Sequence, residues 1–125
     1  MQRYNILWAD DEIDLLKPHI MFLEQRGYDI TPVNNGADAV ELCDDKNFDV
    51  VFLDEHMPGM SGLEALSQIK NNKPNLPVVM ITAKTTDNDV WEGWQAGADF
   101  YITKPFDLDE LMRFIGYLRV NASSS

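Results

Sequence analysis

The sequence predicts an α/β fold in which a parallel sheet is covered by helices on both faces. Five short runs rich in Val, Ile and Leu recur at roughly even intervals along 125 residues, and segments with helical spacing separate them. Strands and helices that alternate in this way are typical of parallel sheets, because each helix crosses over to return the chain to the same edge. The length fits one domain with a substantial core.

The composition of each run indicates its place in the sheet. The first candidate strand is 4–9, and the second, 28–33, contains polar residues and a proline, so it is expected at an edge. Runs 48–53 and 77–82 are almost wholly apolar, as expected for central strands buried on both faces. The last candidate strand is 100–103.

Helix signals lie between these runs. The first helical segment has an apolar stripe, but Pro18 would cost about 3 kcal/mol in a helix interior. We therefore expect this helix to begin near Asp14 or to kink at Pro18. Ser61 and Asp107 each begin a capping-box pattern, so two later helices should begin there. The remaining segment, 85–97, is interrupted by one glycine and stopped by another.

Charge and composition restrict the functions that this domain can have. Twenty-one acidic and ten basic residues give a net charge of −11, which disfavours direct binding of nucleic acid. The apolar runs are too short to cross a bilayer or to form a signal peptide, so we expect a cytoplasmic protein without membrane association. The single cysteine, Cys43, is expected in the core. We expect one domain over 1–120 and a disordered tail or linker over 121–125.

Side chains with complementary chemistry collect where the predicted strands end. In chain order they are Asp10, Asp11, Asp54, Thr82 and Lys104. Each alone could be a turn, cap or surface residue, but ligands of open parallel sheets bind at this edge, so their joint placement indicates a site. Neighbouring carboxylates repel unless a cation holds them, and oxygen ligands favour Mg²⁺ or Mn²⁺. Asp54 could be a metal ligand or a nucleophile that forms an acyl phosphate.

In this order and at this spacing, the motifs resemble the receiver domain of bacterial two-component response regulators, in the CheY-like superfamily. The similarity runs from about Asn5 to Leu118 and rests on the acidic pair, "LDEHMPGMSG", "ITA" and "GADFYITKPF". It implies a flavodoxin-like (βα)5 three-layer sandwich with strand order 2-1-3-4-5. It also implies that Asp54 accepts a phosphoryl group from a sensor histidine kinase or a phosphotransfer protein, with catalytic help from Thr82 and Lys104.

The resemblance further implies how the metal is held. Asp11, Asp54 and the backbone carbonyl of His56 would bind Mg²⁺, and Asp10 would act through a water molecule. The side chains of His56 and Lys84 stand at variable positions near the phosphoryl group and would tune its lifetime. The chain would therefore be a signalling module that catalyses its own phosphorylation and dephosphorylation, not a conventional enzyme.

A switch follows from the same resemblance. A phosphoryl group on Asp54 would draw the Thr82 hydroxyl inward and leave space into which Tyr101 rotates. The face formed by helix 4, strand 5 and helix 5 would then change its affinity for a partner, either a second copy in a homodimer or an output domain. The peptide bond between Lys104 and Pro105 would be cis.

The output class stays open, because the two halves of the chain differ in what they resemble. "ILWADDEIDLLKPHI" is similar to PorX-type receivers, whereas "TKPFDLDELM" is similar to receivers of winged-helix regulators. On the face formed by helix 4, strand 5 and helix 5, which we call the signalling face, an aromatic interface would be formed by Trp91, Trp94 and Phe100. A phosphatase of the haloacid-dehalogenase type is disfavoured, since His56 occupies the position of its second carboxylate. The alternative is a pseudo-receiver that works as an interaction scaffold without phosphorylation.

Overall fold

The computed structural model describes residues 4–83 and 94–124, which form a five-stranded parallel sheet. The strand order is β2-β1-β3-β4-β5, which confirms the predicted topology. The strands are β1 (Tyr4–Ala9), β2 (Tyr28–Val33), β3 (Val50–Asp54), β4 (Val78–Thr82) and β5 (Phe100–Thr103).

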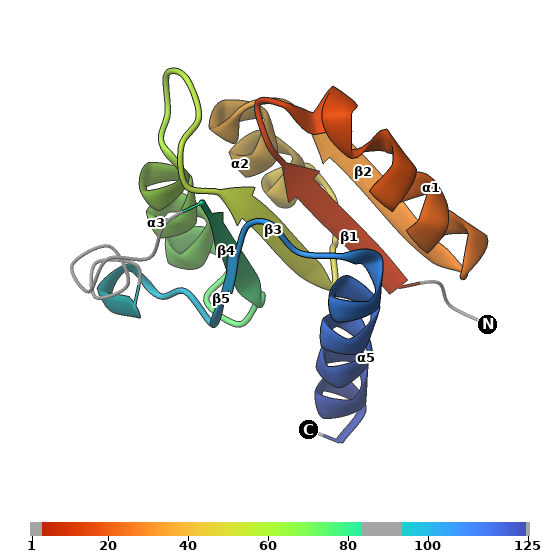
Figure 1. Ribbon diagram of the computed structural model, residues 1–125. Helices are drawn as coiled ribbons and strands as arrows, with labels where there is room; N and C mark the ends of the chain where they lie inside the picture. The colour runs from red at the N-terminus through yellow and green to blue at the C-terminus, as the bar shows by residue number, and fades with distance from the viewer. Residues whose placement is uncertain (1–3, 84–93, 125) are drawn as a thin grey trace.

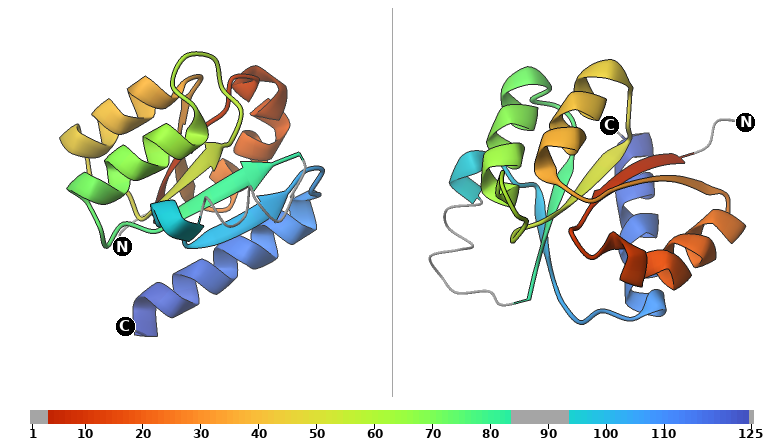
Figure 2. Two further views of the ribbon diagram at one scale, coloured as in Figure 1. Left: turned by 90° about the vertical axis from the view of Figure 1, so that its left-hand side faces the viewer. Right: turned by 90° about the horizontal axis from the view of Figure 1, so that it is seen from above.

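Helices cover both faces of the sheet and make three layers (Figures 1 and 2). On one face α1 (Lys17–Gln25) and α5 (Leu108–Ser124) pack in one apolar cluster, and on the other α2 (Gly36–Asp45) and α3 (Gly62–Asn72) pack in a second. Each cluster takes alternate residues of the central strands, as the pleat of a sheet requires. Among the helices described, none has the length and apolar character that crossing a membrane requires.

The burial of the strands agrees with their predicted places. Every residue of β3 and β4 is buried, and β2 lies at an edge of the sheet. β3 begins at Val50 and not at residue 48 as predicted. Asp49 is exposed and lies directly before the strand. Its carboxylate accepts the Asn5 N–H at 2.7 Å, and this hydrogen bond joins the segment before β3 to β1.

The first helical segment differs from its prediction. Residues Ile13–Leu16 form a 3-10 helix, η1, and the α-helix begins only at Lys17. The predicted start near Asp14 is therefore wrong for the α-helix. Pro18 lies in the first turn of α1, where its missing N–H removes no intrahelical hydrogen bond.

The two predicted caps are confirmed. The Ser61 hydroxyl accepts the Glu64 N–H at 3.2 Å at the start of α3, and the Asp107 carboxylate accepts the Glu110 N–H at 2.7 Å at the start of α5. The backbone of α5 continues to residue 124, where we expected a tail from residue 121, and the expectation of a linker stays a prediction.

The fourth predicted helix falls largely on residues 84–93, which lie outside the described residues. Residues 94–96 are helical, and the chain leaves this turn at Gly97. The Gly97 φ of 106° lies in the left-handed region that favours glycine, so Gly97 stops the helix as predicted.

Candidate functional site

The carboxyl ends of the strands bring the predicted site residues together. Asp54 and Thr82 are the last residues of β3 and β4, Asp10 directly follows β1, and Lys104 directly follows β5. Asp10, Asp54 and Thr82 are 1%, 7% and 0% exposed, respectively. Polar side chains with so little exposure need partners inside the protein, because burial removes their hydration.

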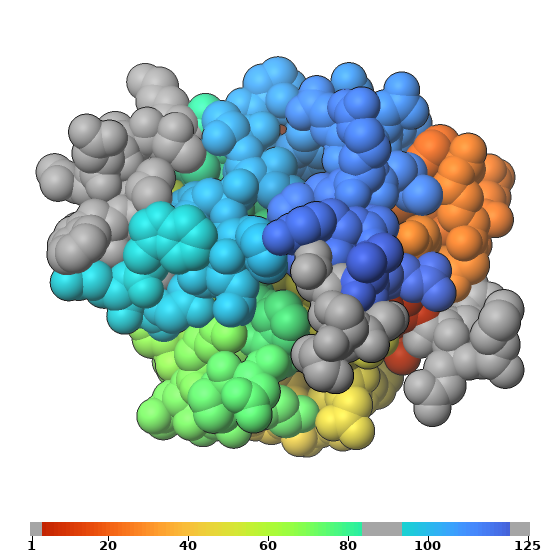
Figure 3. Space-filling model, turned by 90° about the horizontal axis from the view of Figure 1, so that it is seen from below, coloured from red at the N-terminus to blue at the C-terminus, as the bar shows by residue number. Residues whose placement is uncertain are grey.

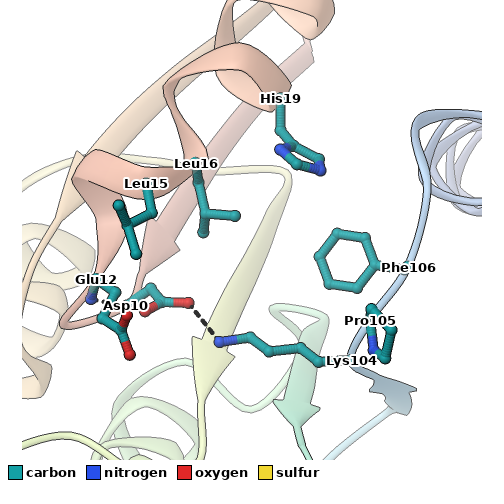
Figure 4. A pocket seen from close by; sticks show the side chains of 8 residues that line it. All are labelled: Asp10, Glu12, Leu15, Leu16, His19, Lys104, Pro105 and Phe106. Atoms are coloured by element: carbon teal, nitrogen blue, oxygen red, sulfur yellow. Dashed lines mark hydrogen bonds and ion pairs between the residues drawn. The ribbon is translucent and has the colours of Figure 1, made fainter.

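Lys104 joins two of the buried carboxylates. Its Nζ donates to Asp10 Oδ2 at 2.9 Å and to Asp54 Oδ2 at 3.2 Å; Figure 4 shows the contact with Asp10. Burial would lower the pKa of Lys104, but the hydrogen bond to Asp10 and the charge of Asp54 outweigh it, so the pKa is raised above its usual value. The ammonium therefore holds a fixed positive charge beside Asp54.

Asp54 lies in a field that disfavours its charge. Burial, followed by the negative charge of Asp10, raises the pKa of Asp54, while Lys104 and the backbone N–H of His56 act in the opposite direction. The His56 N–H donates to Asp54 Oδ1 at 3.3 Å. One ammonium group thus compensates the buried carboxylates only in part, and a bound divalent cation would complete the compensation.

The acidic cluster fits a hard divalent cation. One carboxylate oxygen from each of Asp10, Asp11 and Asp54 lies within 4.8 Å of the others. Mg²⁺ binds oxygen ligands at about 2.0–2.1 Å, so opposite ligands stand about 4 Å apart, which is close to the observed spread. Asp11 is exposed and thus accessible to a hydrated ion. The chemistry and the spacing both suit Mg²⁺ or Mn²⁺.

The predicted switch residues lie on neighbouring strands. Thr82 is fully buried, and its carbonyl accepts the Lys104 N–H at 2.8 Å. Tyr101 is half-buried in β5, beside Met80 of β4, and its ring meets the Trp94 ring edge to face at 5.5 Å. The Lys104–Pro105 peptide bond is cis.

The predicted interface residues have different environments. Trp94 is 46% exposed. Phe100 is half-buried, with its ring 5.4 Å from that of Phe114. Trp91 and the predicted lifetime-tuning residue Lys84 lie outside the described residues.

The sequence prediction did not include Gly62, the residue that lets the start of α3 pack closely against the end of β3. Gly62, the first residue of α3, donates its N–H to the Glu55 carbonyl at 3.0 Å. A Cβ at Gly62 would overlap with the Asp54 carbonyl oxygen and would lie 2.8 Å from Glu55 Cα. The glycine directly after the Ser61 cap was the available signal for this close approach.

Comparison with known proteins identifies one family. Residues 6–116 match the family model described as the response regulator receiver domain. The chain is 32% identical over 126 residues to YkoG of Bacillus subtilis, named as an uncharacterized transcriptional regulatory protein, and the match covers 100% of this chain and 55% of the relative. The chain spans about half the length of the curated relatives it matches.

Solved structures show the same architecture. A receiver domain from Methanospirillum hungatei superposes with a TM-score of 0.90 at 24% identity, covering 99% of this chain and 100% of the other, and it supports the fold alone. The response regulator TrrA of Thermotoga maritima, solved in complex with Mg²⁺-BeF, has a TM-score of 0.81 at 33% identity and covers 92% of this chain and 98% of its own.

Proposed function

Because the chain belongs to the response regulator receiver domain family, we propose that it is a phosphoryl-accepting switch in a two-component system. Asp54 accepts the phosphoryl group from a sensor histidine kinase or a phosphotransfer protein. The observation that carries the proposal is the position of the Asp54 carboxylate, which is buried beside the Lys104 ammonium and forms, with Asp10 and Asp11, an acidic cluster of a size that suits Mg²⁺. Binding to nucleic acid is not proposed for this domain, whose net charge is −11.

The site residues divide the work of phosphoryl transfer. An Asp54 carboxylate oxygen attacks phosphorus, the bond from phosphorus to the leaving group of the donor breaks, and an acyl phosphate forms. Lys104, whose Nζ is 3.2 Å from Asp54 Oδ2, neutralises oxygens of the transferred group, and Asp10 holds the ammonium in place. Asp11, Asp54 and the His56 carbonyl would hold Mg²⁺, with Asp10 acting through water, and the ion would supply the remaining charge neutralisation.

The phosphoryl group then acts on the Thr82 and Tyr101 pair. Its oxygens provide hydrogen-bond acceptors near the Thr82 hydroxyl at the end of β4. Movement of this hydroxyl gives Tyr101, which is half-buried on the adjacent strand, room to turn inward. Because Tyr101 contacts the exposed Trp94, its rotation changes the surface around Trp94.

The changed surface controls a partner. Residues 94–98, β5 and α5 share one face of the molecule (Figure 3), and we assign homodimer formation to this face. The chain spans about half of relatives that are named as transcriptional regulatory proteins, so control of an output domain is part of the proposal. A cytoplasmic location stays a prediction.

Phosphorylation by acetyl phosphate tests the function directly. The protein is incubated with Mg²⁺ and acetyl phosphate, and the intact mass is measured for the wild type, Asp54→Asn and Asp45→Asn. Asp45 is exposed at the end of α2 and serves as a matched control. The wild type and Asp45→Asn should each gain one phosphoryl group, and Asp54→Asn none.

Two other outcomes would contradict the proposal. Failure of the wild-type protein to gain mass would favour the alternative, an interaction scaffold that works without phosphorylation. Equal labelling of Asp54→Asn would place the phosphoryl group on a different residue.

A further inference from the structure

A cavity with mainly apolar walls adjoins the candidate site. A cavity of about 320 Å³ lies between the η1 and α1 segment and the loop that follows β5 (Figure 4). Leu15 and Leu16 reach into it from one side, and Phe106 faces them from the other. His19 closes one end, with its ring 5.9 Å from that of Phe106. The walls are therefore mainly apolar and include an aromatic ring.

The opposite end of the cavity is acidic. Both oxygens of Asp10 are already used, because Oδ2 accepts from Lys104 and Oδ1 accepts the Glu12 N–H at 2.8 Å. The Glu12 side chain also lines the cavity and is exposed, and its carboxylate has no hydrogen-bond or ion-pair partner in the described part of the chain. Glu12 is thus the charged group that is available to a ligand.

We propose that this cavity binds a small organic amine that carries an apolar ring. The ammonium group pairs with the Glu12 carboxylate, and the ring lies between Leu16 and Phe106. A cavity lined by apolar side chains with a few polar groups at one end is typical of small-molecule sites, and about 300 Å³ is enough for one ring with a short substituent.

The charge of the site selects against anionic rings. Asp10 and Glu12 line the polar end, and the Lys104 ammonium there is already shared between Asp10 and Asp54. A carboxylate in place of the ammonium would therefore meet unbalanced negative charge. A neutral ring of the same size would keep the apolar contacts and lose the ion pair.

A titration followed by NMR tests the assignment in the unphosphorylated protein, so its result does not depend on the proposed function. Isotope-labelled protein in Mg²⁺ buffer at constant ionic strength is titrated with benzylamine, benzyl alcohol or benzoate. Benzylamine should shift the methyl signals of Leu15 and Leu16 with a Kd of about 1 mM, as expected for so small a ligand. Benzyl alcohol should bind more weakly, and benzoate more weakly still.

Two pairs of variants at exposed positions separate the site from nonspecific effects. Leu15→Ser removes an apolar wall residue that is 71% exposed, and Met21→Ser changes a similarly exposed residue of α1 that is not part of this cavity. Glu12→Gln removes the proposed anchor, and Asp14→Asn removes a nearby charge that lines a different cavity.

The variants have distinct expected effects. Leu15→Ser should weaken the binding of benzylamine about fivefold, because apolar contact is lost, and Met21→Ser should leave the affinity unchanged. Glu12→Gln should weaken the binding of benzylamine two- to fivefold, which is about the effect of one exposed ion pair, and should not change the affinity for benzyl alcohol. The proposal is wrong if no saturable shift occurs at Leu15 and Leu16, if benzoate binds as well as benzylamine, or if the control variants weaken binding equally.

Discussion

His56 meets the candidate site in two different ways. Its backbone N–H donates to the Asp54 carboxylate at 3.3 Å, and this contact does not depend on the residue type. Its side chain is exposed at the rim of the site, directly after the buried residues 54 and 55. Of these two groups, only the imidazole is removed when His56 is replaced by another residue.

We predict that His56→Asn accelerates dephosphorylation about three- to tenfold. The smaller amide leaves the path of the attacking water more open, and a barrier change of about 1 kcal/mol corresponds to about fivefold in rate. The decay of phosphorylated protein, followed by intact mass after removal of acetyl phosphate, measures the rate. The extent of phosphorylation should stay the same, and an unchanged decay rate would remove the His56 side chain from the mechanism.

Single residues of the site were predictable where each one ends a strand. Asp54 and Lys104 follow apolar runs that can be recognised from their composition alone. The positions of Glu12 and His19 in one cavity were not predictable, because they depend on the 3-10 turn before α1 and on the loop after β5. Those segments meet only in the folded chain.

The first turn of α3 supports the site by packing against the end of β3. Ser61 caps this helix, and Gly62 lets its backbone approach the end of β3. The N–H of Gly62 donates to the Glu55 carbonyl at 3.0 Å, so the helix start is joined to the residue that follows Asp54. The position of α3 and the position of the Asp54 carboxylate are therefore linked.

We predict that Gly62→Ala lowers the free energy of unfolding by at least about 2 kcal/mol, because the added Cβ overlaps with backbone atoms that cannot yield as a side chain would. The matched substitution is Gly116→Ala in α5, where an added Cβ meets nothing within 4 Å. It should raise stability by up to about 1 kcal/mol through helix propensity. Urea unfolding measures both variants.

Equal effects of the two substitutions would contradict this account of Gly62. Gly62→Ala should also slow phosphorylation of the variant that remains folded, since Asp54 and Glu55 must shift to admit the methyl group.

A series of aromatic ring contacts connects the core of the molecule to its surface. A series of ring contacts runs through the layer between the sheet and α5, from Trp8 to Phe52 at 5.4 Å, on to Phe114 at 6.5 Å, and then to Phe100 at 5.4 Å. The series ends at Tyr117, which is 56% exposed. Aromatic side chains thus extend from the core to the face on which Trp94 is exposed.

We predict that Trp94→Ala weakens self-association of the phosphorylated protein about tenfold, because an exposed aromatic residue on the signalling face would anchor the dimer. Sedimentation velocity with beryllofluoride and Mg²⁺ measures the association. Met21→Ala, at a 59% exposed position on α1, is the control and should have no effect. Unchanged association of Trp94→Ala would exclude Trp94 from the interface.

Stability at alkaline pH should depend on Tyr4. Burial, followed by the charge of Asp49, raises the pKa of Tyr4 from 10.0 to about 12. The contribution of the neutral phenol is therefore complete below pH 10.0, the value expected for the unfolded chain, and is lost as the pH rises through about 12. Two pKa units correspond to about 3 kcal/mol.

We predict that Tyr4→Phe loses less stability than the wild type between pH 10.0 and about 12. The ring contact with Tyr28 should persist in the variant, since Tyr4 and Tyr28 meet edge to face at 5.9 Å through their rings. Urea unfolding across this range measures the difference. A parallel decline of both proteins would show that Tyr4 does not titrate as described.

Local sequence patterns were enough to predict the alternation of strands and helices, the edge position of β2, the caps at Ser61 and Asp107, and the collection of Asp10, Asp54 and Lys104 at one edge of the sheet. These features depend on local periodicity and on the rule that parallel strands end together. Three other features depend on the folded chain: the sharing of Lys104 between Asp10 and Asp54, the close approach at Gly62, and the cavity at Phe106. Distances and burial come from packing between segments far apart in the chain, and no local pattern encodes them.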